Sequence, residues 1–229
     1  PAANTAPPAN TVPTQPTSNT QPTLPPAKEA IVTIAGNTCA GFKDVTQTHP
    51  LCPAIQYAKE QSIFAGDPDG TLRPDNVINR AEAVKVILAA FKKTILADNG
   101  SRIYSDTEAN AWYSPYLRTG EIFGITGYPD GTFRPTQQVS KVELLKMFFN
   151  ISGRPLRVRL DEKPYPDVPI DTNTLWYLKY VQEAKKYSLV RTSREGLFYP
   201  AAGMLRGDVA ELVYRYHLAG LDRQLIMNN

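Results

Sequence analysis

The sequence has few of the residues from which catalytic and metal sites are built. Its 229 residues include only two histidines and two cysteines. His49 and His217 occupy unrelated positions, and His49 together with Cys39 and Cys52 is one ligand short of a tetrahedral zinc site. No pattern places a nucleophile beside a base, or two carboxylates across a cleft as a glycosidase requires. We therefore expect no enzyme, no metal and no cofactor.

Long apolar runs and a strong charge imbalance are also absent. No stretch approaches the ~18 apolar residues of a membrane span, so we expect no membrane segment. The net charge of +3 is too small to indicate nucleic acid, although it is compatible with an acidic polymer as partner. No signal peptide is visible, and we expect a mature chain or one whose targeting segment has been removed.

What the sequence does contain is an internal repeat. Residues 127–135 read GYPDGTFRP, residues 66–74 read GDPDGTLRP, and an altered third copy ends at Pro200. The closing prolines Pro74, Pro135 and Pro200 are 61 and 65 residues apart. An aspartate close to an aromatic residue precedes each copy: Asp44, Asp106 and Asp167. Self-similarity at a nearly fixed period indicates one supersecondary unit used three times.

Each copy of the turn lies between two segments with helical spacing of apolar residues. The expected helices are 54–63, 80–91, one opened by 112–115, then 141–150, 176–184 and 208–216. Gly120 and Gly124 predict that a neighbour closely approaches the helix opened by 112–115. Residues 154–160 predict an extended connector. Because so small a unit cannot bury its apolar faces alone, we expect a mainly α protein whose units pack on one another.

The repeat divides the chain into segments. Residues 1–28 are rich in proline and threonine and nearly uncharged, which predicts a disordered linker. Residues 30–34 predict a short strand or a strap against the first unit. The expected repeats are 29–94, 95–154 and 155–220, the third of them degenerate, followed by a C-terminal tail at 221–229.

The three units resemble the S-layer homology (SLH) domain family. The resemblance rests on the aspartate motif, the turn of the form Gly-x-x-Asp-Gly-Thr-Phe-x-Pro and a helix start similar to Thr-Arg-Ala-Glu. It covers roughly residues 42–220, although the third unit has no Asp-Gly pair and no Thr or Ser cap. It implies a pseudo-threefold trimer of repeats, with one helix from each unit at the centre and grooves between neighbouring repeats.

The same resemblance implies an extracellular, non-catalytic module that anchors a surface or S-layer protein to the cell wall. Its ligand would be an anionic, pyruvylated secondary cell-wall polysaccharide, and neighbours in an S-layer lattice would be further partners. The alternative is a peptidoglycan-binding tether of a diderm outer envelope. It stays open because the third unit departs from the family pattern and no helix start has threonine as its cap.

Two helix starts have the pattern of a capping box. Ser140 can accept a hydrogen bond from the Glu143 amide while the Glu143 carboxylate reaches back to the Ser140 amide. Asn79 and Glu82 can do the same one unit earlier. We therefore expect Glu82 and Glu143 to be structural caps.

The second helix of each of the three units is expected to start at or next to a cationic residue: Arg80, Lys141 and Arg206. The helix macrodipole disfavours a cation in the first turn, whereas the free amides there attract anions. No structural partner for these cations is evident, so their repetition predicts contact with an anionic ligand; solvated surface cations are the alternative. In the SLH family the basic residue of this motif belongs to the groove that holds the polysaccharide.

Trp112 and Trp176 match the aromatic position of the family near the first helix of a unit. At that position an indole ring could stack on the face of a sugar. A core role for each ring is the equally open alternative.

The turn residues Gly66, Asp69, Gly127 and Asp130 are further candidates for ligand contact. Pro-Asp-Gly is chiefly a turn signal, and we expect the glycines to supply positive φ. Glycine could also let a sugar approach the backbone. The run that includes Asp69 does not complete a calcium loop, because it has neither the third alternate ligand nor a distal glutamate.

Cys39 and Cys52 flank the first aspartate motif. A disulfide between them would close a short loop and would imply an oxidising compartment. Two unrelated buried thiols are the alternative.

Overall fold

The computed structural model describes residues 37–222. The predictions for the linker at 1–28, for residues 30–34 and for residues 223–229 of the tail lie outside this range. No helix within it is long and apolar enough to cross a membrane.

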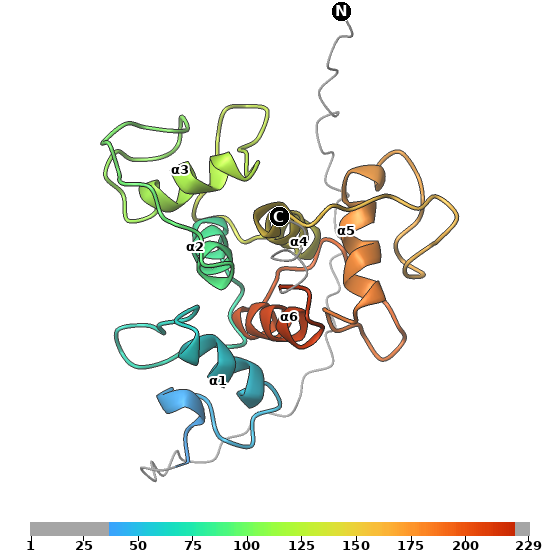
Figure 1. Ribbon diagram of the computed structural model, residues 1–229, viewed down its shortest axis with the longest axis horizontal. Coiled ribbons are helices and arrows are strands. Elements are labelled where there is room, and N and C mark those ends of the chain that lie inside the picture. The colour runs from blue at the N-terminus through green and yellow to red at the C-terminus, as the bar shows by residue number, and fades with distance from the viewer. Residues whose placement is uncertain (1–36, 223–229) are drawn as a thin grey trace, which may run out of the picture. The chain divides into compact units, whose positions relative to one another are not determined.

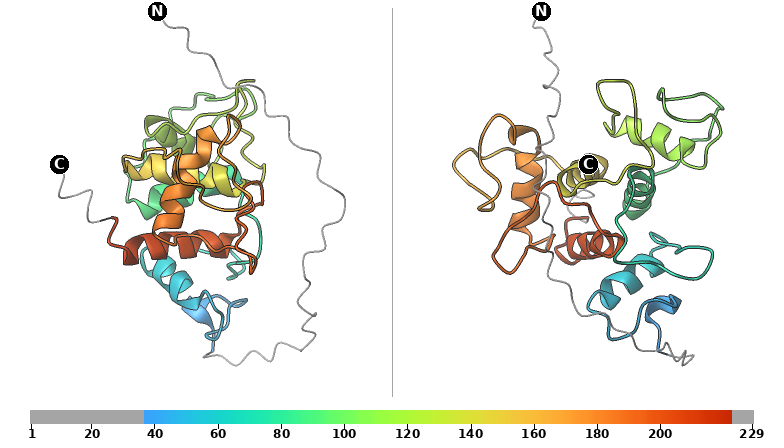
Figure 2. Two further views of the ribbon diagram at one scale, coloured as in Figure 1. Left: turned by 90° about the vertical axis from the view of Figure 1, so that its right-hand side faces the viewer. Right: turned by 180° about the vertical axis from the view of Figure 1, so that it is seen from behind.

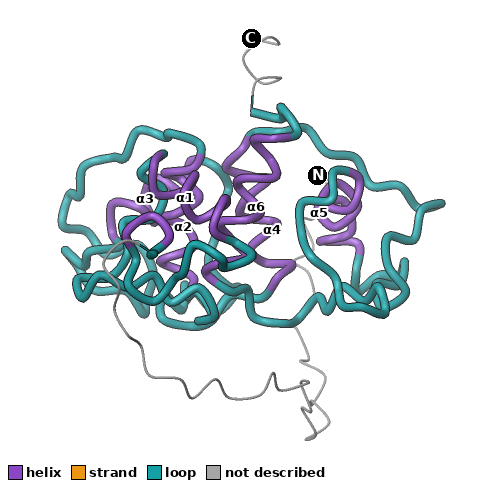
Figure 3. Tube along the Cα trace, turned by 90° about the horizontal axis from the view of Figure 1, so that it is seen from below, coloured by secondary structure: helices purple, strands orange, loops and turns teal. Residues whose placement is uncertain are grey.

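The described chain is built from helices and loops, which confirms the mainly α prediction (Figure 1, Figure 3). A short 3-10 helix, η1 (Cys39–Gly41), precedes six α-helices: α1 (Cys52–Glu60), α2 (Arg80–Ala90), α3 (Ser114–Ile122), α4 (Lys141–Ser152), α5 (Leu175–Lys186) and α6 (Arg206–Leu218). Within residues 37–222, extended pairing is limited to isolated bridges.

Three details of the expected helices are wrong. We expected the first helix to reach residue 63, but it ends at Glu60, and Ser62 is exposed with a left-handed φ of 58°. The third helix begins at Ser114, with Pro115 in its first turn, so Trp112 precedes it. The last helix begins at Arg206, two residues before the expected start.

The first helix of each unit packs on the second helix of another unit. α3 packs on α2, α5 packs on α4, and α1 packs on α6, which brings the first and last units together (Figure 2). At Gly120 of α3, an added Cβ would lie 3.2 Å from a methyl group of Val84 on α2. The predicted close approach at this glycine is therefore present.

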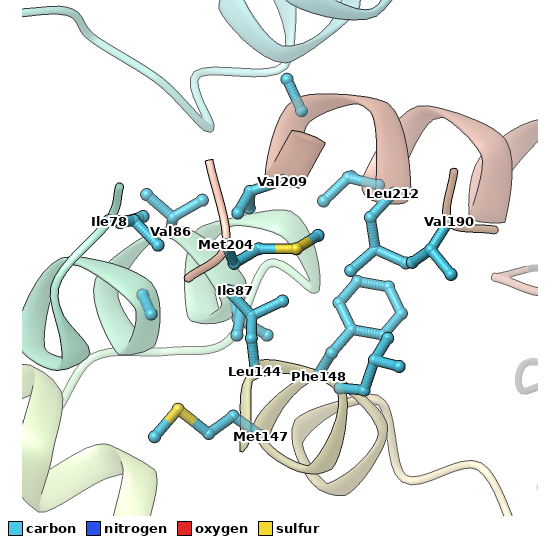
Figure 4. Close-up of a cluster of buried hydrophobic side chains, with 14 of the residues drawn as sticks. Ile78, Val86, Ile87, Leu144, Met147, Phe148, Val190, Met204, Val209 and Leu212 are labelled. Atoms are coloured by element: carbon cyan, nitrogen blue, oxygen red, sulfur yellow. The ribbon is translucent and has the colours of Figure 1, made fainter. Parts of the chain in front are cut away.

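The second helices α2, α4 and α6 lie at the centre and supply much of the core (Figure 1, Figure 4). Phe148 of α4 contacts Phe91 and Tyr216 edge to face, with ring centroids 4.9 and 5.1 Å away. Ile87 and Leu144 are fully buried beside them. Each such side chain stabilises the fold by about 1.5–3 kcal/mol through removal of apolar surface from water.

Backbone hydrogen bonds join the units in a cycle. The first residue of each central helix donates its amide to a carbonyl of the following unit: Arg80 to Gln137 at 2.9 Å, Lys141 to Ala202 at 2.8 Å and Arg206 to Asn76 at 2.9 Å. The bonds run from the first unit to the second, from the second to the third, and from the third back to the first. They favour the pseudo-threefold packing that the family resemblance implies.

Cys39 and Cys52 form a disulfide, with a Cα–Cα distance of 5.7 Å. It ties η1 to the first residue of α1. Because α1 packs on α6, the bond lies beside the contact between the first and last units.

Candidate functional site

The aspartate motif holds the turn that follows it in each unit. Asp44 accepts hydrogen bonds from the amides of Leu72 at 2.8 Å and Arg73 at 2.6 Å. Arg73 has a left-handed φ of 56°, a conformation that costs a non-glycine residue about 1–2 kcal/mol. The other units repeat the arrangement, with Asp106 on Phe133 and Arg134 and with Asp167 on Phe198 and Tyr199. The sequence showed this motif but not its role.

The three helix-start cations bind these same turns across the boundaries between units. We number the contacts as joints: Arg80 Nε donates to the Phe133 carbonyl at 2.9 Å (joint 1), Lys141 Nζ to the Phe198 carbonyl at 2.6 Å (joint 2), and Arg206 Nε to the Leu72 carbonyl at 2.7 Å (joint 3). The inference that these cations have no structural partner is therefore wrong. Their contact with a ligand stays a prediction.

The predicted capping boxes are present at α2 and α4. Glu82 donates its amide to Asn79 Oδ1 at 2.9 Å, and its carboxylate accepts from the Asn79 amide at 3.2 Å. Ser140 and Glu143 repeat the box. The two glutamates also face cations of other units, since Arg80 lies 3.2 Å from Glu143 and Arg206 lies 3.7 Å from Glu82.

Joint 1 is covered by a tyrosine. The guanidinium groups of Arg80 and Arg134 both contact the Tyr128 ring, 4.6 and 4.0 Å from its centroid, and the Tyr128 hydroxyl donates to Glu143 at 2.8 Å. Burial is the main reason that the pKa of Tyr128 rises to about 12. The Arg80 side chain is only 5% exposed, so little of it is accessible to a ligand.

The pKa of Glu143 reflects the same surroundings. Burial alone would raise it, but hydrogen bonds from Ser140 and Tyr128, together with the charge of Arg80, outweigh burial and lower the pKa. Glu143 is therefore held as a carboxylate.

Joint 2 differs from joint 1 in its charges. Within residues 37–222, no carboxylate lies within 4.0 Å of the Lys141 ammonium. Asp208, which occupies the repeat position of Glu82 and Glu143, pairs with Arg191 instead. Burial lowers the pKa of Lys141. A cavity of about 10 Å³ is lined by Lys141 together with Arg191, Asp208 and Glu211, among other residues.

Joint 3 is again an arginine held by acids. Arg206 lies 3.5 Å from Asp67 and 3.7 Å from Glu82, and its side chain is 11% exposed. The ring of Phe64 lies 5.7 Å from its guanidinium carbon. Arg206 is thus paired in much the same way as Arg80.

A lysine of one unit and a tryptophan of the next unit meet at two places. Lys85 Nζ of α2 lies 5.6 Å from the centroids of both Trp112 and Tyr116. Lys146 Nζ of α4 lies 5.6 Å from the centroid of Trp176. We call these the first and the second lysine–tryptophan pair. Trp112 is 53% exposed, so its ring is not a core residue, whereas Trp176 is half-buried.

The two lysines were missed in the sequence. Lys85 and Lys146 are 61 residues apart, which is the period of the repeat, so a register-by-register comparison of the helices would have found them. The equivalent residue of the third unit is Glu211. A surface cavity of about 320 Å³ lies beside it, lined by Pro50, Pro53 and other residues of α1 and α6.

The turn residues proposed as ligand contacts have structural partners. Asp69 accepts from the amide and hydroxyl of Thr71 at 3.0 and 2.6 Å and pairs with Arg73 at 2.6 Å. Asp130 does the same with Thr132 and Arg134. Hydrogen bonds from Thr132 and Arg134 lower the pKa of Asp130 to about 2.

The two turn glycines are required for different reasons. Gly66 has a φ of +84°, as predicted, and an added Cβ would also lie 2.4 Å from the Phe42 ring. Gly127 has no positive φ, so that part of the prediction is wrong. An added Cβ there would lie 2.4 Å from the Thr132 carbonyl and 2.7 Å from the Tyr104 ring. Close packing therefore requires the second glycine.

Comparison with known proteins shows that the chain belongs to the S-layer homology domain family. Residues 41–84 and 125–144 match the S-layer homology domain. The chain is 32% identical over 165 residues to a cellulosome-anchoring protein of Acetivibrio thermocellus, an alignment that covers 70% of this chain and 36% of the relative. It is also 32% identical over 95 residues to S-layer protein EA1 of Bacillus anthracis, covering 41% of this chain and 10% of the relative. The chain therefore spans only about a third of the first relative and a tenth of the second.

Proposed function

This chain carries S-layer homology domains, and on that premise we propose that it anchors a protein to the cell surface by binding an anionic secondary cell-wall polysaccharide, without catalysis. Its similarity to a cellulosome-anchoring protein and to an S-layer protein supports an extracellular, wall-associated location. The disulfide agrees, because such bonds persist in oxidising compartments.

The lysine–tryptophan pairs are the observation that carries the proposal. A saccharide presents apolar C–H faces that stack on an exposed indole, and a carboxylate on the same sugar needs a cation nearby. Trp112 and Lys85 offer both groups in the first lysine–tryptophan pair. Trp176 and Lys146 repeat the combination one unit later. A pyruvate ketal attached to a sugar has this pairing of an apolar face and a carboxylate.

The helix-start cations have different parts in this proposal. Arg80 and Arg206 are buried and paired with carboxylates, so they position the walls of their joints. Lys141 is the cation among the three that is free of a carboxylate partner within the described range. We assign ligand contact to Lys85, Lys146 and Lys141. Two or more joints that bind one polymer would raise the overall affinity by avidity.

The test is retention on purified wall sacculi, native or stripped of secondary polymer with hydrofluoric acid. We expect the wild-type chain to bind native sacculi and to be released by stripping. Trp112→Ala should weaken retention, while Lys163→Ala, which removes an exposed lysine away from the lysine–tryptophan pairs, should not. Retention that survives stripping would make peptidoglycan the ligand. No retention on either preparation would disprove the proposed function.

A further inference from the structure

We propose that Arg191 is a positioning residue of joint 2: it holds Asp208 away from Lys141, so that the lysine is left to bind an anion. The inference rests on the proposed function, because the anion is the carboxylate of the wall polysaccharide. It concerns one residue of the third unit that has no counterpart in the other two.

The repeat register shows what is different about joint 2. Arg191 lies nine residues before Pro200, and the residues nine before the two earlier turn prolines are Ala65 and Thr126. Neither of those side chains can form an ion pair. Asp208 takes the position of Glu82 and Glu143, which face the cations of joints 3 and 1. The register therefore predicts that Asp208 should face Lys141.

Asp208 pairs with Arg191 instead. The Arg191 guanidinium binds the Asp208 carboxylate through one nitrogen and Glu211 through Nε at 2.8 Å. The N-cap of α6 is Leu205, which has no side-chain acceptor, so Asp208 is not held in a capping box as Glu82 and Glu143 are. The loss of the cap leaves this carboxylate free to turn toward the arginine.

Lys141 is left with unused donors. An ammonium has three donor hydrogens, and within residues 37–222 one of them is directed to the Phe198 carbonyl. The cavity of about 10 Å³ beside it has the volume of a single water. One carboxylate oxygen has a similar size. The cavity therefore has room for an anion that places a single oxygen against Lys141, while Arg191 stays bound to Asp208 and Glu211.

Removal of Arg191 would favour pairing of Asp208 with Lys141. Glu211 would stay paired with Arg215, whose Nη2 lies 2.7 Å from it. Asp208 would lose its partner, and the nearest uncompensated cation would be Lys141, as the register of joints 1 and 3 requires. An internal carboxylate on Lys141 would then compete with the ligand.

The experiment is an NMR titration with a methyl glycoside that carries a pyruvate ketal, with the methyl ester of the same ketal as the uncharged control. The amides of Lys141 and Phe198 report joint 2 separately from the other joints. We expect Arg191→Ala to weaken binding at joint 2 by about three- to tenfold, in the range of ordinary coupling between sites. Arg191→Lys should retain much of the affinity, and Arg191→Ala with Asp208→Asn should restore it.

The double variant separates positioning from folding. If Arg191→Ala acted only by loosening the fold, Asp208→Asn would not rescue binding, and that result would overturn the proposal. Unchanged or tighter binding by Arg191→Ala would overturn it as well. Arg194→Ala, a neighbouring exposed arginine, serves as the matched control and should bind as the wild type does.

A second readout needs no ligand and survives failure of the proposed function. The pKa of Lys141 can be followed by NMR of its side chain, where Asp208, Asp167 and Arg191 are the charged groups that act on it. In Arg191→Ala the pKa should rise, because the arginine is gone and Asp208 approaches. Adding Asp208→Asn should lower it again. A pKa that Asp208→Asn does not change in this background would contradict the proposal even if no glycan binds.

Discussion

Joints 1 and 2 occupy the same position in the repeat, but they differ in the burial of their cation and in whether a carboxylate pairs with it. At joint 1, Arg80 is buried under Tyr128 and paired with Glu143. At joint 2, Lys141 is half-buried, and the carboxylate in register with it is bound by Arg191. The same repeated position can therefore hold a cation that joins two units at one site and a cation that is left for a ligand at another.

The largest effect on stability should come from joint 1. Arg80→Ala removes one partner of a partly buried ion pair, which leaves Glu143 without its cation and the Phe133 carbonyl without this donor. We expect a loss of about 3 kcal/mol in the free energy of unfolding, measured by urea denaturation. Lys141→Ala is the matched variant at joint 2 and should cost about 1 kcal/mol. Equal losses at the two joints would remove the distinction between them.

The aspartate that supports joint 1 should follow in size. Asp106→Ala leaves the amides of Phe133 and Arg134 without their acceptor, and one of them belongs to a residue with a left-handed φ of 60°. We expect a cost of about 2 kcal/mol in unfolding free energy. Asp98→Ala is the control and should cost much less, because this half-buried carboxylate accepts from a single amide, that of Gly100, and lies as far as 4.0 Å from Arg118. A similar cost for both would contradict the role assigned to the motif.

The lysine–tryptophan pairs should affect binding more than stability. Trp112→Ala removes a ring that is 53% exposed, so the unfolding free energy should change by less than about 1 kcal/mol. Retention on native sacculi should fall, because the stacking surface is lost. Trp112→Phe keeps an aromatic face and should retain more binding than alanine. Full retention by Trp112→Ala would exclude this ring from the ligand contact.

The smallest effect concerns acid. Because the pKa of Glu143 is lowered in the folded state, its contribution is present above the unfolded pKa and is lost as the pH falls through the folded one. Glu143→Gln should therefore make stability less dependent on pH in the acidic range, below the ordinary pKa of glutamate. The measurement is urea denaturation at several pH values. A variant with the same pH dependence as the wild type would show that the pKa of Glu143 does not differ between the folded and unfolded states.

The fold was largely predictable because its signals are local and repeated. The turn at residues 127–135, the caps at Glu82 and Glu143 and the apolar spacing of α2 and α4 all depend on neighbours in sequence. The ends of α1 and α6 were less predictable: Ser62 adopts a left-handed turn where no glycine marks it. The cyclic pairing of α1 with α6 joins residues far apart in the chain and came only from the family resemblance.

The candidate site was less predictable, because its key contacts cross between units. Arg80, Lys141 and Arg206 were found by repetition, but their bonds to Phe133, Phe198 and Leu72 span 53 to 134 residues. The Asp130 and Asp69 turns show the reverse, since their partners lie within four residues. A repeat therefore reveals candidate functional positions, and the structure shows which of their side chains already have structural partners.

The most direct test of the central claim is the retention of Lys85→Ala with Lys146→Ala on native sacculi, beside the wild type and Lys163→Ala. We expect the double variant to stay in solution with an unchanged melting temperature, because Lys85 is exposed and Lys146 makes no ion pair within the described residues. Retention of the double variant equal to that of the wild type would contradict the claim that the module holds an anionic glycan at the two lysine–tryptophan pairs.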